Sequence, residues 1–503
     1  MLKPKAKELN SPDASLATPA AAPRIIPRSE HAISRSHISP NALRVLYRLR
    51  DAGFMAFLVG GCVRDLLLGI EPKDFDVATD ALPEQVKRLF RNSRLVGRRF
   101  RLAHVFFGRE IIEVATFRAT SAPSQGDEPL PEADPEDGEA PELDEPLLAD
   151  AVEAEDAPRP SRPEADTDEE DSAERRFDAT GRILRDNVYG TIDEDVWRRD
   201  FTCNALYYNI ADFSVWDYVN GVRDVESRTL RLIGDPETRY REDPVRMLRA
   251  ARFEAKLGFQ IDAATAQPIA RLRELLSGVP PARLFDETLK LFLTGHGARS
   301  FEVLRQRGLL AALLPTVDAY FSAHPASLVE QLLVQGLKQT DTRVLADKPV
   351  TPTFLFALLL YGPIAGLIES APPARWHELS TILEACDRAT REAQARVAIP
   401  KRFSLGVREM FALQPRLEHP RGRRALRLLE HPRFRAAYDL LLLRAQFALA
   451  PREMAEWWTQ LQEVPAEERG RMADALVGEA QARAPQGVRR RGRRRRRRGA
   501  GST

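Results

Sequence analysis

Two aspartates separated by a single residue, Asp74 and Asp76, are the first side chains in this sequence whose spacing suggests chemistry. Their surroundings read as a strand, on which residues two apart project to the same face. Neighbouring carboxylates repel each other unless a proton or a cation neutralises them, and hard oxygen ligands suit Mg²⁺. Taken alone, such a pair is more often a solvated turn, so a metal site requires a second signal nearby.

A glycine pair just upstream supplies that signal. Gly60 and Gly61 follow a short apolar run, 54–59, that reads as a buried strand, and they precede a short helix. Glycine lets the backbone approach a phosphate closely, and the free N–H groups at a helix start attract anions. Arg64, one turn into the helix, can direct its guanidinium to the same phosphates. Together, the glycine turn and the carboxylate pair indicate a binding site for a metal-bound nucleoside triphosphate. In such a site, two metal ions can bridge the attacking hydroxyl and the phosphate.

A third carboxylate is expected from a neighbouring strand. Glu113 stands inside the otherwise apolar segment 111–115. A buried acid needs a partner, and a shared metal would supply one. The same pattern also fits an exposed glutamate on an edge strand, and the sequence alone does not choose between these two interpretations.

Two later segments combine charged and polar residues in short motifs. Segment 198–206 reads RRDFTCNAL, and segment 241–249 reads REDPVRMLR. In the second segment, Asp243 and Arg246 are three positions apart, which predicts one shared helix face. An acid that accepts from an exocyclic amine and an arginine that donates to ring acceptors can together read a base edge. Without further information, a helical salt bridge is the favoured interpretation of this pair.

These segments resemble the motifs of class II RNA nucleotidyltransferases, which comprise bacterial poly(A) polymerases and CCA-adding tRNA nucleotidyltransferases. Segment 57–118 resembles their catalytic head, and the two later motifs resemble the family patterns RRDFTxNAL and EDxxRxLR. Four motifs in the correct order over 57–293 carry the resemblance. Cys203 stands where the family usually has isoleucine, a change within an apolar slot that we expect to affect packing only.

The resemblance implies a role for each motif residue. Asp74 and Asp76 are the expected catalytic ligands of two Mg²⁺ ions, with Mn²⁺ as an alternative and Glu113 as an extra metal ligand. Asp200 is expected to be catalytic, beside the nucleotide sugar. The RNA 3′-hydroxyl would attack the α-phosphorus of the nucleotide, and pyrophosphate would leave. The expected nucleotide-binding residues are Gly60, Gly61, Arg64, Asn204, Asp243, Arg246 and Arg249.

Other features favour the poly(A) polymerase branch of this family. Segments 94–105, 186–190 and 234–240 resemble stretches of bacterial poly(A) polymerases, and no His-Asp phosphohydrolase motif is present. The expected function is therefore template-independent transfer of AMP from ATP to RNA 3′ ends, which promotes RNA processing and decay. The alternatives are a CCA-adding enzyme and a non-catalytic RNA-binding protein that retains a dead transferase head.

The charge distribution also indicates a polyanionic partner. The net charge of +2 conceals 21 acidic residues against two arginines in 127–174, so the remaining chain carries about +21. Nine of the ten residues in 489–498 are arginine. A basic surplus of this size favours phosphate binding by counterion release. The expected partners are ATP, RNA 3′ ends and proteins of RNA decay, with no DNA and no membrane.

Cysteine usage and hydropathy point to the cytoplasm. Cys62, Cys203 and Cys386 are odd in number and far apart, so they support neither a disulfide framework nor a zinc site. No apolar run approaches the roughly 18 to 20 residues that a membrane helix needs, and the N-terminus lacks a signal core. We therefore expect a cytoplasmic protein.

The elements that must position these residues read as an α+β fold, with a small mixed sheet in an N-terminal nucleotidyltransferase head and an all-helical C-terminal region. Near the end of the helical region, Trp457 and Trp458 could stack on bases, but helix neighbours face different ways, so we expect at least one to pack in the core. The expected divisions are a disordered basic N-terminus (1–38), the head (39–225), an acidic disordered insertion within it (121–180), a helical nucleotide-recognition neck (226–310), a helical RNA-binding body (311–484) and a disordered arginine-rich tail (485–503).

The arginine tail leads to a first prediction. Truncation before Val488 should weaken RNA binding and flatten its dependence on salt, because each phosphate left without its cationic partner reduces the slope of log K against log salt by about 0.7 for single strands. Filter binding at several salt concentrations measures both quantities. If affinity and slope are unchanged, the arginines are a solubility tail and do not hold RNA.

Overall fold

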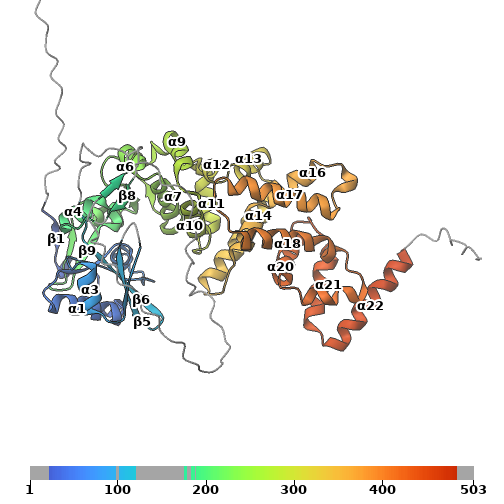
Figure 1. The fold of residues 1–503 in the computed structure, drawn as a ribbon, viewed down its shortest axis with the longest axis horizontal. Helices are drawn as coiled ribbons and strands as arrows, with labels where there is room; N and C mark the ends of the chain where they lie inside the picture. The colour runs from blue at the N-terminus through green and yellow to red at the C-terminus, as the bar shows by residue number, and fades with distance from the viewer. Residues whose placement is uncertain (1–21, 98–100, 120–174, 178–182, 187, 484–503) are drawn as a thin grey trace, which may run out of the picture. The chain divides into compact units, whose positions relative to one another are not determined.

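The computed structural model describes residues 22–97, 101–119, 175–177, 183–186 and 188–483 (Figure 1). The chain forms two compact units. We call them the sheet unit (Met1–Val279 with Glu302–Ala312) and the helical unit (Pro280–Phe301 with Leu313–Thr503). The predicted α+β class, a head with a mixed sheet followed by a helical region, is confirmed.

An eight-stranded mixed sheet organises the sheet unit, in the order β1-β10-β9-β2-β3-β6-β5-β4. Strands β3 and β6 pair in parallel, whereas the other neighbours in the sheet are antiparallel. The strands are β1 (Arg24–Ile26), β2 (Ala56–Val59), β3 (Asp76–Thr79), β4 (Ser93–Val96), β5 (Leu102–Phe107), β6 (Glu110–Thr116), β9 (Leu206–Asn209) and β10 (Val215–Asp217). Strands β11 (Thr229–Leu230) and β12 (Gln260–Ile261) form a separate parallel pair.

Helices pack on the sheet where the sequence pattern places apolar faces. The predicted face of α1, with apolar residues at positions 42, 45, 46 and 49, is buried, and the Ser39 hydroxyl caps the helix start. Both α1 and α3 contact the sheet and each other. The helices of this unit are α1 (Pro40–Asp51), α2 (Gly61–Leu67), α3 (Pro83–Leu89), α4 (Ile192–Arg198), α5 (Gly221–Glu226), α6 (Pro236–Glu242), α7 (Val245–Leu257), α8 (Ala263–Ala266) and α9 (Ile269–Leu272).

One face of the sheet holds a buried cluster that fixes β2, β3 and α4 together. Phe57 lies in this cluster, with its ring centroid 6.0 Å from that of Tyr207 and 6.2 Å from that of Phe117. Val196 of α4 is fully buried in the same cluster. Every residue of β2 is buried, as the apolar run 54–59 predicts for a central strand.

The N-terminal segment differs from the prediction of disorder through residue 38. Strand β1 pairs with β10 at the edge of the sheet, and Ile26, Ile33 and Ile38 are buried. The prediction is therefore wrong for residues 22–38. The average composition of the segment hides these three isoleucines, whose burial offsets the ordering entropy of the chain around them.

Several predicted features lie wholly or mainly outside the described residues. These are the first 21 residues of the N-terminus, residues 98–100 of segment 94–105, most of the acidic insertion, Asn187 and the arginine tail. At the far end of the predicted insertion, β7 (Arg175–Phe177) pairs antiparallel with β8 (Ile183–Asp186). Disorder throughout 121–180 is therefore wrong for residues 175–177, since cross-strand hydrogen bonds satisfy their backbone.

The helical unit is an assembly of packed helices, and most of them begin with proline, serine or threonine signals. In its core the ring of Phe285 stacks on that of Phe356 at 5.9 Å and on that of Phe403 at 6.1 Å. Its helices are α10 (Pro281–Phe292), α13 (Pro315–Ala323), α14 (Leu328–Leu345), α15 (Pro352–Leu359), α16 (Tyr361–Glu369), α17 (Leu379–Gln394), α18 (Lys401–Glu418), α19 (Leu426–Leu429), α20 (Phe434–Gln446), α21 (Arg452–Glu463) and α22 (Ala466–Arg483). Helix α11 (Gly297–Gln306) is divided between the two units, and α12 (Leu309–Leu313) lies mainly in the sheet unit.

Among the described residues, one bent pair of helices is long and apolar enough to reach across a membrane. Across the described ranges, no single helix is long and apolar enough to cross a bilayer. Helices α15 and α16 reach that length and composition only together, and they bend by 46° at their junction.

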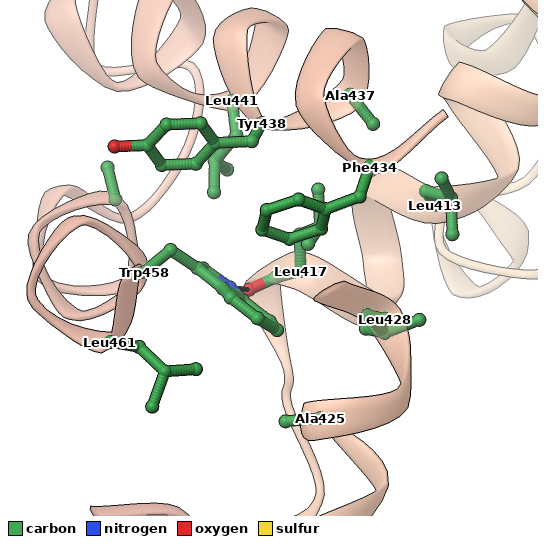
Figure 2. Packing of buried hydrophobic residues seen from close by; sticks show 11 residues of the cluster. Leu413, Leu417, Ala425, Leu428, Phe434, Ala437, Tyr438, Leu441, Trp458 and Leu461 are labelled. Atoms are coloured by element: carbon green, nitrogen blue, oxygen red, sulfur yellow. Dashed lines mark hydrogen bonds between the residues drawn. The ribbon is translucent and has the colours of Figure 1, made fainter. Parts of the chain in front are cut away.

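Trp458 anchors a second core cluster, at the end of the helical unit. Figure 2 shows its indole packed beside Phe434, with Leu461 and Leu417 nearby. The side chain is fully buried, and its Nε1–H donates to the carbonyl oxygen of Leu417 at 2.8 Å. Trp457 is only partly buried against the same cluster. The expectation that at least one of the two tryptophans packs in the core is confirmed.

This packing generates a prediction about stability. Trp458→Ala should lower the free energy of unfolding by about 3 to 5 kcal/mol, because it leaves a large cavity and an unpaired carbonyl. Trp457→Ala, the adjacent control, should cost distinctly less. Urea unfolding followed by circular dichroism compares the two, and equal losses would contradict the assignment of Trp458 as the anchor.

Candidate active site

The glycine turn and the aspartate pair meet in the sheet unit. Gly60 links β2 to α2 with φ +83°, a backbone conformation that residues with a side chain rarely adopt. A Cβ built on Gly60 would stand 3.8 Å from an Asp76 carboxylate oxygen and 3.9 Å from Nη1 of Arg199. Gly61 is the first residue of α2. The backbone of the turn therefore lies directly beside one carboxylate and one guanidinium.

The three predicted metal ligands lie on or beside adjacent parallel strands. Asp76 begins β3 and pairs in register with Glu113 of β6, so both side chains occupy the same face of the sheet. Strand β6 lies between β3 and β5, so Glu113 is half-buried on an interior strand and the edge-strand alternative is wrong. Asp74 precedes β3 and is exposed, with buried Phe75 between the two aspartates. Only Asp76 of that pair is on the strand itself.

The electrostatics of these acids fit a hard cation. Burial raises the pKa of Asp76 to about 6, the charges of Glu113 and Asp74 add to the effect, and Arg199 opposes it. Burial likewise raises the pKa of Glu113, against the opposing charge of Arg118. A divalent ion would relieve this repulsion.

The acids do not form a closed metal cage. In the part of the chain that the structure describes, no group of three or more His, Cys, Asp or Glu side chains forms a ready metal-ligand set. Magnesium commonly takes one or two carboxylates and completes its shell with water and substrate phosphates. Asp74 and Asp76 fit that incomplete donor set.

Arg64 joins the glycine turn at Gly60 to the RRDFTCNAL motif. Its Nη1–H donates to Oδ1 of Asn204 at 2.6 Å, and its Nε–H donates to Asp65 at 2.8 Å. Arg64 is 2% exposed, so its guanidinium is buried and holds the Asn204 side chain in place. Cys203 is buried beside Asn204, which agrees with the packing role expected for the apolar slot.

An ion pair between Asp200 and Arg249 joins the RRDFTCNAL motif to the REDPVRMLR motif. Both Nε and Nη2 of Arg249 donate to one carboxylate oxygen of Asp200, the first at 2.8 Å. Burial alone would raise the pKa of Asp200, but Arg249 holds it below its usual range. The guanidinium carbons of Arg64 and Arg249 lie 5.8 and 5.7 Å from the centroid of the Phe253 ring on α7. The Phe253 ring, which no sequence motif includes, also lies 5.6 Å from the ring of Phe201, so it supports the glycine turn, the RRDFTCNAL motif and the REDPVRMLR motif together.

Asp243 and Arg246 do not occupy one helix. Asp243 follows the last residue of α6, Glu242, and has an extended backbone, and α7 begins at Val245. The prediction of a shared helix face is wrong because Pro244 disfavours helical backbone at the residue before it. Arg246 is 8% exposed and donates to the Arg239 carbonyl at 2.7 Å and to the carboxylate of Glu242 at 2.9 Å. Glu242 is thus the salt-bridge partner of Arg246.

A buried aspartate that the sequence analysis missed fixes the two arginines of the RRD motif. Asp195 is 1% exposed and accepts from Arg198 at 2.7 Å, from Arg199 at 3.0 Å and from the Tyr207 hydroxyl at 2.7 Å. Burial would raise its pKa, but Arg199 and Arg198 hold that pKa well below the usual range. The spacing of three and four residues between Asp195 and these arginines is the sequence signal that could have revealed it.

Comparisons with known proteins find family models and relatives that match most of the chain. Three family models match the chain: "Poly A polymerase head domain" over 56–231, "Probable RNA and SrmB- binding site of polymerase A" over 258–321, and "Polymerase A arginine-rich C-terminus" over 374–498. The chain is 46% identical to poly(A) polymerase I of Salmonella typhi over 450 residues, which covers 89% of this chain and 87% of that protein.

Two further similarities are more distant. The chain is 32% identical to the CCA-adding enzyme of Lactobacillus helveticus over 262 residues, 52% of each protein. A solved tRNA-processing enzyme with CTP shares the fold, with a TM-score of 0.51 at 20% identity over 87% of this chain and 98% of that one.

The Asp195 network predicts a pH-dependent loss of stability. Asp195→Asn removes the charge that neutralises Arg198 and Arg199, so it should destabilise the sheet unit at pH 7 by about 3 to 5 kcal/mol. Because the folded pKa of Asp195 is depressed, the wild-type advantage is present above about pH 4 and shrinks as pH falls further toward the folded pKa. Tyr207→Phe, which keeps the charge, should cost about 1 kcal/mol. Denaturant unfolding at pH 7 and pH 3 tests this, and a difference independent of pH would contradict it.

Proposed function

The chain belongs to the bacterial poly(A) polymerase family and is a polynucleotide adenylyltransferase, and we propose that the residues around Gly60 and Asp76 perform its transfer of AMP from ATP to RNA 3′ ends. The observation that carries this assignment is the approach of the Gly60 backbone to the Asp76 carboxylate and the Arg199 guanidinium. A phosphate chain at that turn would meet a glycine backbone, a positive group and an acid that needs a cation.

Enzymes of this family use divalent metals, and the finer assignment of ligands is our proposal. Asp74 and Asp76 would hold two Mg²⁺ ions, with Glu113 as an additional ligand and Mn²⁺ as an alternative ion. When bound, such ions make the 3′-hydroxyl a better nucleophile and neutralise charge on the phosphates. The raised pKa of Asp76, caused by burial and by Glu113, supports a cation beside it.

The protein groups contribute positioning and charge. The turn at Gly60 and Gly61 admits the phosphates close to the backbone, and Arg199 places positive charge beside them. The RNA 3′-hydroxyl loses its proton to solvent, its oxygen forms a bond to the α-phosphorus while the bond to the bridging oxygen breaks, and pyrophosphate departs with the electron pair. No covalent enzyme intermediate is required, so catalysis rests on alignment and electrostatic stabilisation.

We assign binding of the nucleotide sugar to the RRDFTCNAL motif and binding of the base to the REDPVRMLR motif. Asp200 and Asn204 would lie beside the ribose, each held by an arginine, Arg249 and Arg64 respectively. We propose that Asp243 accepts from the exocyclic amine of adenine and that Arg246 donates to the ring. The bond from Arg246 to Glu242 supports this role, because it fixes one guanidinium nitrogen and leaves the others to the base.

The environment and partners follow from the same chemistry. The protein handles nucleotides and RNA, and we propose that it acts in the cytoplasm on varied RNA 3′ ends together with proteins of RNA decay. Cys62, Cys203 and Cys386 are all buried and unpaired, which suits a reducing compartment. The CCA-adding alternative is less favoured, since those relatives match only about half of the chain. A non-catalytic role is disfavoured because the charged groups of every motif are present.

Nucleotide choice provides the test of the reaction. Purified protein incubated with a generic RNA, Mg²⁺ and each nucleoside triphosphate in turn should produce long tails with ATP alone. Gel electrophoresis of the products reads the outcome. Addition that occurs on tRNA only and stops after C-C-A would replace the proposal with the alternative, and no addition at all would favour the non-catalytic role.

Substitution of the carboxylates tests the residue assignments separately. Asp74→Asn and Asp76→Asn should each reduce AMP addition by at least about 100-fold, comparable to losing one key group from a pre-organised electrostatic site. RNA affinity should stay unchanged. Asp51→Asn, at an exposed acid that ends α1, is the matched control and should retain full activity. Near-wild-type activity in either carboxylate variant would remove that residue from the mechanism.

A further inference from the structure

A cavity in the helical unit, lined from α14, α15 and α20, lies outside every motif described above. Its volume is about 400 Å³. Three arginines line it: Arg343 of α14, and Arg433 and Arg435 at the start of α20. Phe354 and Leu442 line it as well, so the walls combine cationic and apolar groups. A cavity of this size and mixed lining is within the range that small ligands occupy.

The charge of the cavity is positive, because Asp439 is its one acidic lining residue among those described. Arg435 forms an ion pair with Asp439 at 3.1 Å. Arg343 donates to the carbonyl oxygen of Pro349 at 3.1 Å, and Arg433 donates through Nε to Glu409 at 3.2 Å. Each guanidinium has five N–H donors, so these bonds leave most donors of Arg343 and Arg433 for a ligand. Planar guanidinium groups suit the oxygens of a phosphate.

The apolar groups supply the other half of a recognition site. Leu442 is 37% exposed although it is a large aliphatic residue, and Phe354 is only partly buried. Stacking on an aromatic side chain is tolerant of base identity because every base has a π-face. An RNA-handling protein of broad substrate range needs contacts of that kind.

We propose that this cavity is an RNA subsite that binds one nucleotide of the substrate strand, with its phosphate on Arg343, Arg433 and Arg435 and its base against Phe354 and Leu442. The inference rests on the proposed function only in that RNA is the substrate. It does not depend on which carboxylates hold the metal, since the cavity belongs to the helical unit and the carboxylates belong to the sheet unit.

Variants of the full-length protein test the subsite. Arg343→Ala/Arg435→Ala should weaken binding of a single-stranded RNA by about tenfold or more and reduce the salt slope by about 0.7 for each phosphate that the variant no longer neutralises. The matched control is Arg388→Ala/Arg452→Ala. Arg388 and Arg452 are likewise exposed, and each forms an ion pair one helical turn away, as Arg435 does, but neither lines the cavity. The control should bind RNA like the wild type.

Catalytic and structural readouts separate this proposal from the assignment of the active site. With primers of increasing length, the cavity variant should match the wild type on the shortest RNA and should show a raised KM, with unchanged kcat, on longer ones. RNA that contains 4-thiouridine should crosslink to peptides of α15 or α20, and it should do so equally in the Asp76→Asn variant, whatever activity that variant retains.

Competition distinguishes the two sources of a nucleotide. Crosslinking should be displaced by unlabelled RNA and should persist in millimolar ATP or inorganic phosphate, which supports the RNA strand as occupant. Displacement by ATP or phosphate at those concentrations would overturn the proposal in favour of a free anion. Equal RNA affinity in cavity and control variants, or crosslinks confined to other segments, would also overturn it.

Discussion

The partly buried ion pair between Asp200 and Arg249 is the constraint on which the rest of the site depends. It joins residues that are 49 positions apart in the sequence, and the cost of withdrawing two charges partly from water offsets much of the attraction between them. Such a pair is poor as a source of stability but effective in fixing one geometry. Because Arg249 belongs to α7, its hold on Asp200 also sets the position of Phe253, on which Arg64 packs. The position of the glycine turn follows from that of Arg64, because the two belong to one short junction.

A second constraint acts on the sheet face beside the turn. Asp76 and Glu113 stand in register on parallel strands, where the charge of Glu113 raises the proton affinity of Asp76, and Arg199 is the positive group that limits this effect. Arg199 remains there because Asp195 and Tyr207 hold it in place. On this acidic face, Asp76 is therefore balanced by the tethered guanidinium of Arg199, and Glu113 is balanced by the charge of Arg118. This balance is the physical basis of the proposal that a metal-bound triphosphate binds here.

The helical unit meets a different requirement. Its cores are closed by aromatic contacts, around Phe285 and around Trp458, and the cavity between α14, α15 and α20 keeps arginines whose donors the fold does not fully use. RNA of varied sequence is best held by charge and stacking, which need no base-specific geometry. The two proposed sites thus make different demands: precise alignment at the carboxylates of the sheet, and tolerant contacts at the cavity between the helices.

The sequence by itself determined what depends on local periodicity and on backbone freedom: the β2–Gly60–α2 junction, the buried face of α1, the carboxylate pair at residues 74 and 76, and the family motifs. Only the tertiary structure decided which groups meet. Arg64 contacts Asn204 across 140 residues, Asp195 organises the arginine pair, Glu242 binds Arg246, and three isoleucines order the segment before residue 39. Spacing along a helix or strand specifies a face, but the partner of that face is chosen by packing between elements distant in sequence.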